Sequence, residues 1–253
     1  MASRATALTH RGQHRHSCSY RRKQQRFCRC AASSITQEAT RQVAVEVEKA
    51  ARNSRRLYAG IDIAAPVELV WGALTDYDGL GTFIPGLAEN RCLERRPAGA
   101  KLLQVGEQDL AFGTKFRARV VLDIREHERG IPAALLHGSR SNGHSERGSG
   151  GESSNGREES SFPEPRSPLN GAPARDISFA MVDGDFQAFQ GVWRMQQGKA
   201  GSNSTRLSYA LFVRPQIWMP IRLIQGRIEG EIANNLGAVR KHSERLFAGL
   251  GDN

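Results

Sequence analysis

Few side chains in this sequence of 253 residues have the types and spacing that catalysis requires. The histidines considered for proton transfer, His127, His137 and His242, lie far apart along the chain. The sequence contains no metal-spaced group of His, Cys, Asp or Glu, no glycine-rich phosphate loop and no motif for an activated nucleophile. We therefore predict no catalytic residue, no metal site and no resident cofactor.

One group of titratable residues leaves an acid–base function open. Tyr209, Asp185 and Glu107 could converge in a pocket, and such convergence would favour an enzyme. Nothing in their spacing along the chain places them together. We accordingly expect a binding protein rather than an enzyme.

The basic residues are concentrated at the N-terminus. The whole chain has a formal charge of +10, and residues 1–30 carry eight basic side chains and no Asp or Glu. The remaining residues are nearly neutral, with 28 basic against 26 acidic side chains. The high net charge therefore does not indicate a nucleic-acid partner, and we expect none.

An Arg-rich, acid-free N-terminus without a long apolar stretch is typical of an organelle transit peptide. The sequence FCRCAA at 27–32 resembles the cleavage region of plant and algal plastid transit peptides. We predict a plastid (chloroplast) transit peptide at 1–30 and a linker at 31–42. A mitochondrial presequence and a basic arm that binds nucleic acid are the alternatives. Cleavage would leave Cys92 as the sole cysteine, which excludes a disulfide framework, and we interpret Cys92 as a buried, unreactive thiol.

Apolar residues that alternate with polar ones predict that much of the chain forms strands. Pro66 precedes apolar residues at spacings of three and four, which predicts an amphipathic helix at 67–76. Asp183-Gly184 predicts a tight hairpin turn. The predicted strands are 43–48, 57–65, 91–95, 101–107, 115–128, 177–182, 185–196 and 205–213.

A second amphipathic pattern predicts a long C-terminal helix at 221–248, with an apolar stripe from Ile221 to Leu246. At 100° per residue, its glycines at 226, 230 and 237 fall on the face opposite that stripe. They therefore do not make room for a ligand beneath the helix.

Two other features are predicted to face water. Residues 138–175 are rich in Gly, Ser, Pro and Asn, so we expect a disordered surface insertion there. Arginines recur on the predicted strands, and we interpret them as a solvated face of the sheet. They are Arg117, Arg119, Arg194 and Arg206.

Three blocks of the sequence resemble one superfamily. Residues 63–77 (IAAPVELVWGALTDY) with 83–87 (FIPGL) resemble the opening of the polyketide cyclase/dehydrase and lipid-transport superfamily. Residues within 212–236 are similar to its last strand and helix. Residues 182–193 (VDGDFQAFQGVW) resemble the coenzyme Q-binding START-type branch found in plant plastid proteins.

This resemblance implies an α+β helix-grip (START-like) fold, in which a curved antiparallel β-sheet wraps around a long C-terminal α-helix. The domain would span 43–250, interrupted by the insertion. Such a fold can leave an apolar cavity, so we expect a hydrophobic ligand: a prenylquinone, another isoprenoid or a lipid. The residues expected to line the cavity are Phe112, Phe116, Phe179, Met181, Phe189, Trp193, Tyr209, Leu211, Ile224 and Ile228.

Trp218 and Met219 lie in a proline-flanked loop before the C-terminal helix. We predict that this loop gates the cavity or makes a peripheral contact with a membrane.

Two other functions stay open, because one fold hosts many activities. The chain could be a polyketide-cyclase-like enzyme. It could also be a ribosome- or protein-interaction module, although its near-neutral charge after residue 30 does not favour binding to a ribosome.

Overall fold

The computed structural model describes residues 43–109, 115–136, 161–200 and 203–251. The predicted transit peptide, the linker at 31–42 and residues 138–160 of the predicted insertion lie outside these ranges.

Eight strands form one antiparallel sheet in the order β1-β2-β8-β7-β6-β5-β4-β3. Strands that are adjacent in the sheet are also consecutive in the sequence, except β2 and β8, which pair from Arg55↔Val213 to Ile63↔Thr205. The strands are β1 (Val45–Ala51), β2 (Ser54–Ile63), β3 (Leu87–Arg96), β4 (Gly99–Asp109), β5 (Lys115–His127), β6 (Ala174–Gly184), β7 (Phe186–Gln197) and β8 (Thr205–Pro215). All eight predicted strands are confirmed.

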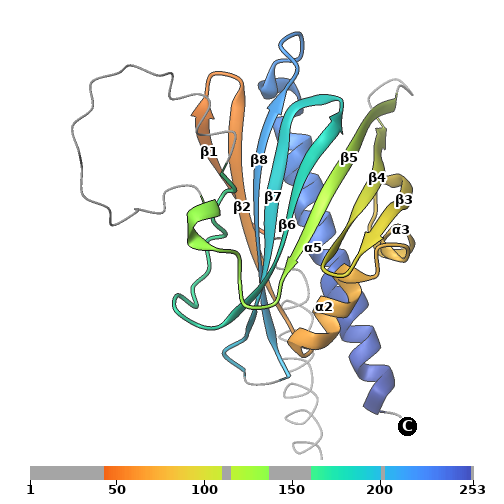
Figure 1. The fold of residues 1–253 in the computed structure, drawn as a ribbon, viewed down its shortest axis with the longest axis vertical. Coiled ribbons are helices and arrows are strands. Elements are labelled where there is room, and N and C mark those ends of the chain that lie inside the picture. The colour runs from red at the N-terminus through yellow and green to blue at the C-terminus, as the bar shows by residue number, and fades with distance from the viewer. Residues whose placement is uncertain (1–42, 110–114, 137–160, 201–202, 252–253) are drawn as a thin grey trace, which may run out of the picture. The chain divides into compact units, whose positions relative to one another are not determined.

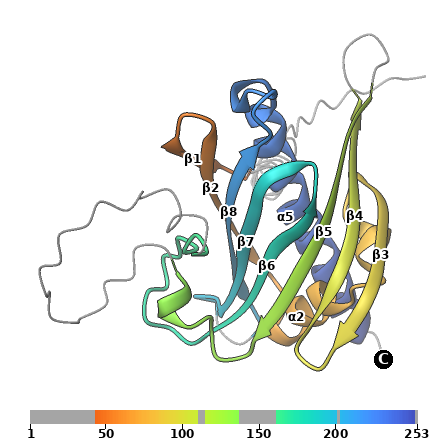
Figure 2. The same ribbon diagram turned by 45° about the horizontal axis from the view of Figure 1, so that its top comes forward.

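Helix α5 (Ile221–Gly251) lies against one face of this sheet, with β1–β2 on one side of it and β3–β4 on the other (Figures 1 and 2). Helices α2 (Val67–Thr75) and α3 (Leu80–Phe83) lie beside it, and a short 3-10 helix, η2 (Ala133–Leu135), follows β5. Pro66 is the N-cap of α2, and its carbonyl accepts hydrogen bonds from the first-turn amides. The predicted helix-grip fold is confirmed.

The apolar stripe of α5 packs on the concave side of the sheet. Ile221, Ile224, Ile232, Leu236 and Val239 are buried in the main core. Ser243 is the last buried position, and Leu246 is 42% exposed, so the stripe ends earlier than predicted. The helix glycines lie on the opposite face as expected, because a Cβ at any of them would touch nothing within 4 Å.

The predicted tight hairpin at Asp183-Gly184 is wrong. The last register pair between β6 and β7 is Ala180↔Gln190, and Asp183 and Gly184 pair with β5 instead. The Asp183 carboxylate accepts a hydrogen bond from the Arg119 side chain at 2.7 Å, and Asp185 accepts one from the Arg119 amide at 2.7 Å. These contacts hold the end of β6 on β5, and the two strands separate at this end of the sheet.

The predicted disordered insertion is also too long. Residues 161–173 pack on the outer face of the sheet, and β6 already begins at Ala174. The carbonyl of Ser161 accepts a hydrogen bond from Gln190, and Arg166 pairs with Glu46 and Glu48. Side-chain partners on the sheet thus order a segment whose own composition provides little apolar surface.

The prediction that the strand arginines lie on a solvated face of the sheet holds for only some of them. Arg117 and Arg119 have exposed side chains, with 60% and 47% of their surface accessible. The side chain of Arg194, by contrast, is only 15% exposed and forms ion pairs with Asp176 and Glu164. Arg194 is therefore an element of the packed outer face.

Candidate functional site

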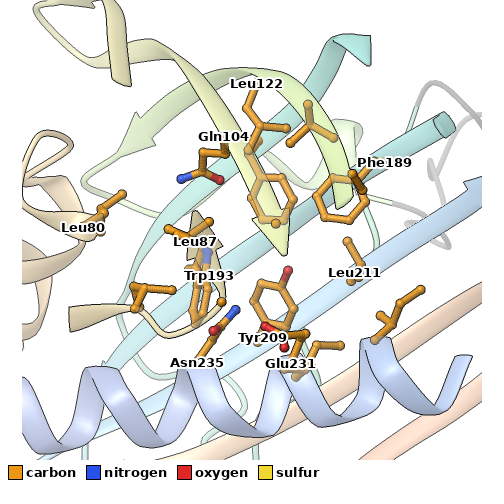
Figure 3. A pocket seen from close by; sticks show the side chains of 18 of the residues that line it. Leu80, Leu87, Gln104, Leu122, Phe189, Trp193, Tyr209, Leu211, Glu231 and Asn235 are labelled. Carbon is orange, nitrogen blue, oxygen red and sulfur yellow. The ribbon is translucent and has the colours of Figure 1, made fainter. Parts of the chain in front are cut away.

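A cavity of about 260 Å³ lies between the sheet and α5 (Figure 3). Its walls come from β4 to β8 on one side and from the first four turns of α5 on the other. Helices α2 and α3 and the loop before β3 close it laterally. The volume is slightly below the 300–1,000 Å³ of typical small-molecule sites. A larger ligand must therefore extend through the mouth.

Strand alternation gives the cavity its aromatic wall. Trp193 and Tyr209 are register partners on β7 and β8, with ring centroids 4.2 Å apart. Phe179 on β6 continues the wall, since its ring lies 6.1 Å from Tyr209 and 5.8 Å from Phe189. Phe186 lies 5.3 Å beyond Phe189. Together these rings present a continuous surface on which a flat apolar molecule can pack.

Gly191 makes this arrangement possible. It lies between Phe189 and Trp193 on the cavity side of β7 and is the register partner of Phe179. A Cβ at Gly191 would lie 2.5 Å from the Phe179 ring and 2.4 Å from the carbonyl oxygen of Ala210. A glycine is therefore required for the Phe179 ring to lie flat across β7.

Seven of the ten residues predicted from the sequence line the cavity. Met181 packs on the core but does not line the cavity. Phe112 lies outside the described residues, and the side chain of Phe116 on β5 is not described. The seven that come together are Phe179, Phe189, Trp193, Tyr209, Leu211, Ile224 and Ile228.

Sequence reasoning missed the lateral wall. This wall comes from α2, α3 and the following loop, and its apolar members are Leu74, Tyr77, Leu80, Ile84 and Leu87. The helical spacing that predicted α2 marked Leu74 as apolar, but nothing local indicated that α2 would face a cavity. That placement depends on the packing of α2 against α5.

Two tyrosines line the cavity with different hydroxyl environments. The Tyr77 hydroxyl donates a hydrogen bond to Glu126 at 2.7 Å. The Tyr209 hydroxyl has no partner among the residues that the structure describes, although Tyr209 is only 7% exposed. Burial raises the pKa of both hydroxyls above the ordinary value of 10.0, so both stay protonated at neutral pH.

The other polar groups of the cavity include two side-chain amides. Gln104 donates to Asn90 at 3.0 Å, which leaves its amide oxygen available to accept. Asn235 on α5 has a buried amide oxygen that accepts no hydrogen bond from the described residues. These groups fix few positions in an otherwise apolar lining.

Charged side chains lie at the rim. Glu107 pairs with Arg117 at 3.2 Å, and Arg227 and Glu231 extend from successive turns of α5. Gly86, with a φ of +77°, brings the loop before β3 against the Glu231 carboxylate, which would lie 2.7 Å from a Cβ there. The rim is therefore polar, and the interior is apolar.

The remaining titratable candidates lie away from the cavity. Asp185 bonds to the Arg119 amide in the β6–β7 connection, and Cys92 is a half-buried thiol in β3. His127 contacts the Ser178 hydroxyl at 2.9 Å, and His242 stacks on Phe83 at 4.1 Å. Burial is the main cause that lowers the pKa of both histidines. His137 lies outside the described residues, in which no group of three His, Cys, Asp or Glu could hold a metal ion.

The loop before α5 presents one predicted residue outward and the other inward. Trp218 is 75% exposed, and the neighbouring Ile217 is 85% exposed. Met219 packs on the core, and its carbonyl accepts a hydrogen bond from Asn53 at 3.3 Å. Within the described ranges, no helix combines the length and the apolar composition needed to cross a bilayer.

Comparison with protein families gives one match over most of this domain. The model for polyketide cyclase / dehydrase and lipid transport proteins matches residues 63–240. A search of curated protein sequences gives no significant match.

A search of solved structures also gives matches of low sequence identity. A STAR-related lipid transfer protein from Xanthomonas axonopodis aligns with a TM-score of 0.54 at 12% identity, over 81% of this chain and 94% of that chain. A START superfamily protein from Mycobacterium smegmatis gives 0.47 at 13% identity, over 76% and 98%. The Zhui aromatase/cyclase from Streptomyces sp. R1128 gives 0.48 at 15% identity, over 76% and 94%.

Proposed function

Because the chain belongs to the polyketide cyclase/dehydrase and lipid transport family, we propose that it binds and transfers a hydrophobic small molecule in the cavity between the sheet and α5. The observation that carries the proposal is the apolar cavity itself, with an aromatic wall inside and a polar rim at the mouth. Removal of apolar surface from water drives a ligand into such a site.

The separation of the candidate acid–base residues favours binding over catalysis. Tyr209 and Glu107 line the cavity, but Asp185 is engaged with Arg119 outside it. A cyclase-like reaction would require titratable groups that converge on the reacting atoms.

A prenylquinone is the ligand class that we propose. The aromatic wall suits a flat ring, and Ile224 and Ile228 of α5 give an isoprenoid tail apolar surface to pack on. A cavity of about 260 Å³ accommodates a ring and the beginning of a tail rather than a whole long-chain lipid.

Ligand extraction tests this proposal. The protein is purified without detergent, extracted with organic solvent and analysed by mass spectrometry, beside a variant whose cavity is blocked by Ala118→Phe. We expect a quinone or other isoprenoid in stoichiometric amount from the wild type and much less from the variant. An extract without any hydrophobic ligand, together with no binding of added prenylquinone, would contradict the proposal.

We also propose that the exposed loop before α5 contacts a membrane surface during transfer. Ile217, Trp218 and Leu223 are 85%, 75% and 70% exposed, and Arg222 between them is exposed and basic. The loop adjoins the cavity, since Gln216 donates a hydrogen bond to the carbonyl of Phe186, which lines it. Apolar side chains flanked by a cation suit the interface of an anionic bilayer.

Co-sedimentation with vesicles of phosphatidylcholine and phosphatidylglycerol tests the membrane contact. The double variant Ile217→Ser, Trp218→Ser should bind at least about tenfold more weakly, because two apolar side chains no longer enter the interface. The matched control is Leu250→Ser, which removes a side chain of similar exposure (64%) at the far end of α5. Equal losses in both variants would contradict a specific role for the loop.

For localisation, we propose import into a chloroplast, with a mitochondrion as the alternative. The support is the basic, acid-free composition of residues 1–30. A fluorescent fusion of residues 1–40 should enter plastids, and a diffuse cytosolic signal would contradict the proposal.

A further inference from the structure

The Tyr209 hydroxyl opens onto this cavity and has no hydrogen-bond partner among the described residues. Tyr209 is only 7% exposed, and no described residue accepts its proton. In Figure 3 the hydroxyl points into the space between the sheet and α5. A ligand that fills this space would cover the hydroxyl, and a covered hydroxyl without a hydrogen bond is costly. A ligand that offers an acceptor to Tyr209 is therefore favoured over one that does not.

The surroundings of Tyr209 indicate what kind of partner fits. Its ring packs against Trp193 at 4.2 Å and Phe179 at 6.1 Å, so the hydroxyl lies among aromatic surfaces. The indole of Trp193, which can only donate, also has no hydrogen-bond partner among the described residues and lies on the same side of the cavity (Figure 3). Neighbouring donors on an aromatic wall favour a flat ligand that carries an acceptor.

We propose that Tyr209 donates a hydrogen bond to a ring oxygen of the ligand, so that the cavity selects a flat carbonyl- or quinone-type molecule over a hydrocarbon of the same shape. This inference rests on the proposed binding function and adds its polar determinant. A site built to bond a ligand oxygen rejects the analogue that lacks it, because the buried donor then stays unpaired.

Tyr77 is the internal control for this proposal. It also lines the cavity and is 1% exposed, but its hydroxyl is already bonded to Glu126 at 2.7 Å. Replacing either tyrosine by phenylalanine keeps the ring and removes one oxygen. Only the Tyr209 change removes a donor that the ligand can use.

The test is isothermal titration calorimetry of the full chain with two probes, 2-geranyl-1,4-naphthoquinone and 2-geranylnaphthalene, which differ in the two ring oxygens. We expect Tyr209→Phe to weaken quinone binding about tenfold and to leave hydrocarbon binding unchanged. Tyr77→Phe should leave the ratio of the two affinities as in the wild type.

Several outcomes would overturn the inference. One is an equal change for both probes in Tyr209→Phe, and another is no change for either probe. Wild-type protein that bound the hydrocarbon as tightly as the quinone would also overturn it, whether or not the variant folds. Failure of both probes to bind the wild type is a different result, because it contradicts the proposed function itself.

Discussion

One polar side chain on each face of the central strands, Asp176 outside and Tyr209 inside, differs in its hydrogen bonding. On the outer face, Asp176 is fully buried and accepts hydrogen bonds from the Arg194 side chain at 2.9 and 3.0 Å and from the Ile131 amide at 2.9 Å. On the inner face, Tyr209 is nearly as buried, but no described residue satisfies its hydroxyl. The Asp176 carboxylate is matched within the protein, although Ser208 Oγ on the same face is buried without a partner, and the Tyr209 hydroxyl is the group that we propose a ligand pairs with.

The packing of the two faces differs in the same way. Residues 161–173 cover the outer face, where Ile131, Leu136, Val192 and Phe162 form a small second core. The inner face keeps an unfilled volume of about 260 Å³ beneath α5. Complete packing stabilises the fold, and incomplete packing provides a binding site, so substitutions on the two faces should be separable by their effects.

The largest expected effect is a loss of stability on the outer face. Asp176→Ala removes the carboxylate and leaves Arg194, whose side chain is 15% exposed, with only the more distant Glu164 at 3.6 Å. We expect the free energy of unfolding to fall by about 3 kcal/mol, because a buried charge loses its main partner. The midpoint of urea denaturation measures this change.

The control is a second cross-strand Asp–Arg pair in the same sheet. Asp62 on β2 lies 3.3 Å from Arg206 on β8, but its side chain is 79% exposed. Asp62→Ala should change stability by less than about 1 kcal/mol. Equal losses for the two variants would show that burial does not distinguish these pairs.

The second prediction compares an Ala→Phe substitution on the inner face with one on the outer face. Ala118 on β5 lines the cavity, so Ala118→Phe should fit into open space, cost less than about 1 kcal/mol of stability and weaken ligand binding at least about tenfold. Ala210 on β8 is fully buried on the outer face, and Ala210→Phe should destabilise the fold by about 1–3 kcal/mol. Thermal unfolding and prenylquinone titration measure the two effects. The comparison fails if Ala118→Phe is the more destabilising variant.

The sequence predicted the inner face better than the outer one for a local reason. Phe189, Gly191 and Trp193 alternate along one strand, so each strand predicts its own inward side chains. Tyr209 and Leu211 on β8 follow the same rule. Strand alternation could not predict that the Tyr209 hydroxyl lacks a partner, because this depends on side chains from other strands and from α5.

The outer face depends on contacts between distant parts of the sequence. Arg194 and Asp176 are cross-strand partners, and the segment that covers them begins at Ser161. Its composition predicted disorder, since the apolar contacts of Phe162 and the ion pairs of Arg166 use partners more than 25 residues away. Composition describes what a segment can bury by itself, and here the sheet provides the rest.

The smallest expected effect is the pH dependence contributed by His127 on the outer face. Burial lowers its pKa below 6.5 and Arg125 lowers it further, whereas Asp176 opposes the shift. The unfolded chain therefore takes up a proton at a higher pH than the folded one, so the stability that His127 contributes is present above pH 6.5 and is lost as the pH falls below it. His127→Gln should flatten the fall in the urea midpoint between about pH 7 and pH 5.

The inner face should not share this dependence, because the tyrosines there stay protonated throughout that range. The prenylquinone affinity should therefore stay constant across the same pH range in both proteins. A parallel loss of affinity and stability would show that the two faces are coupled.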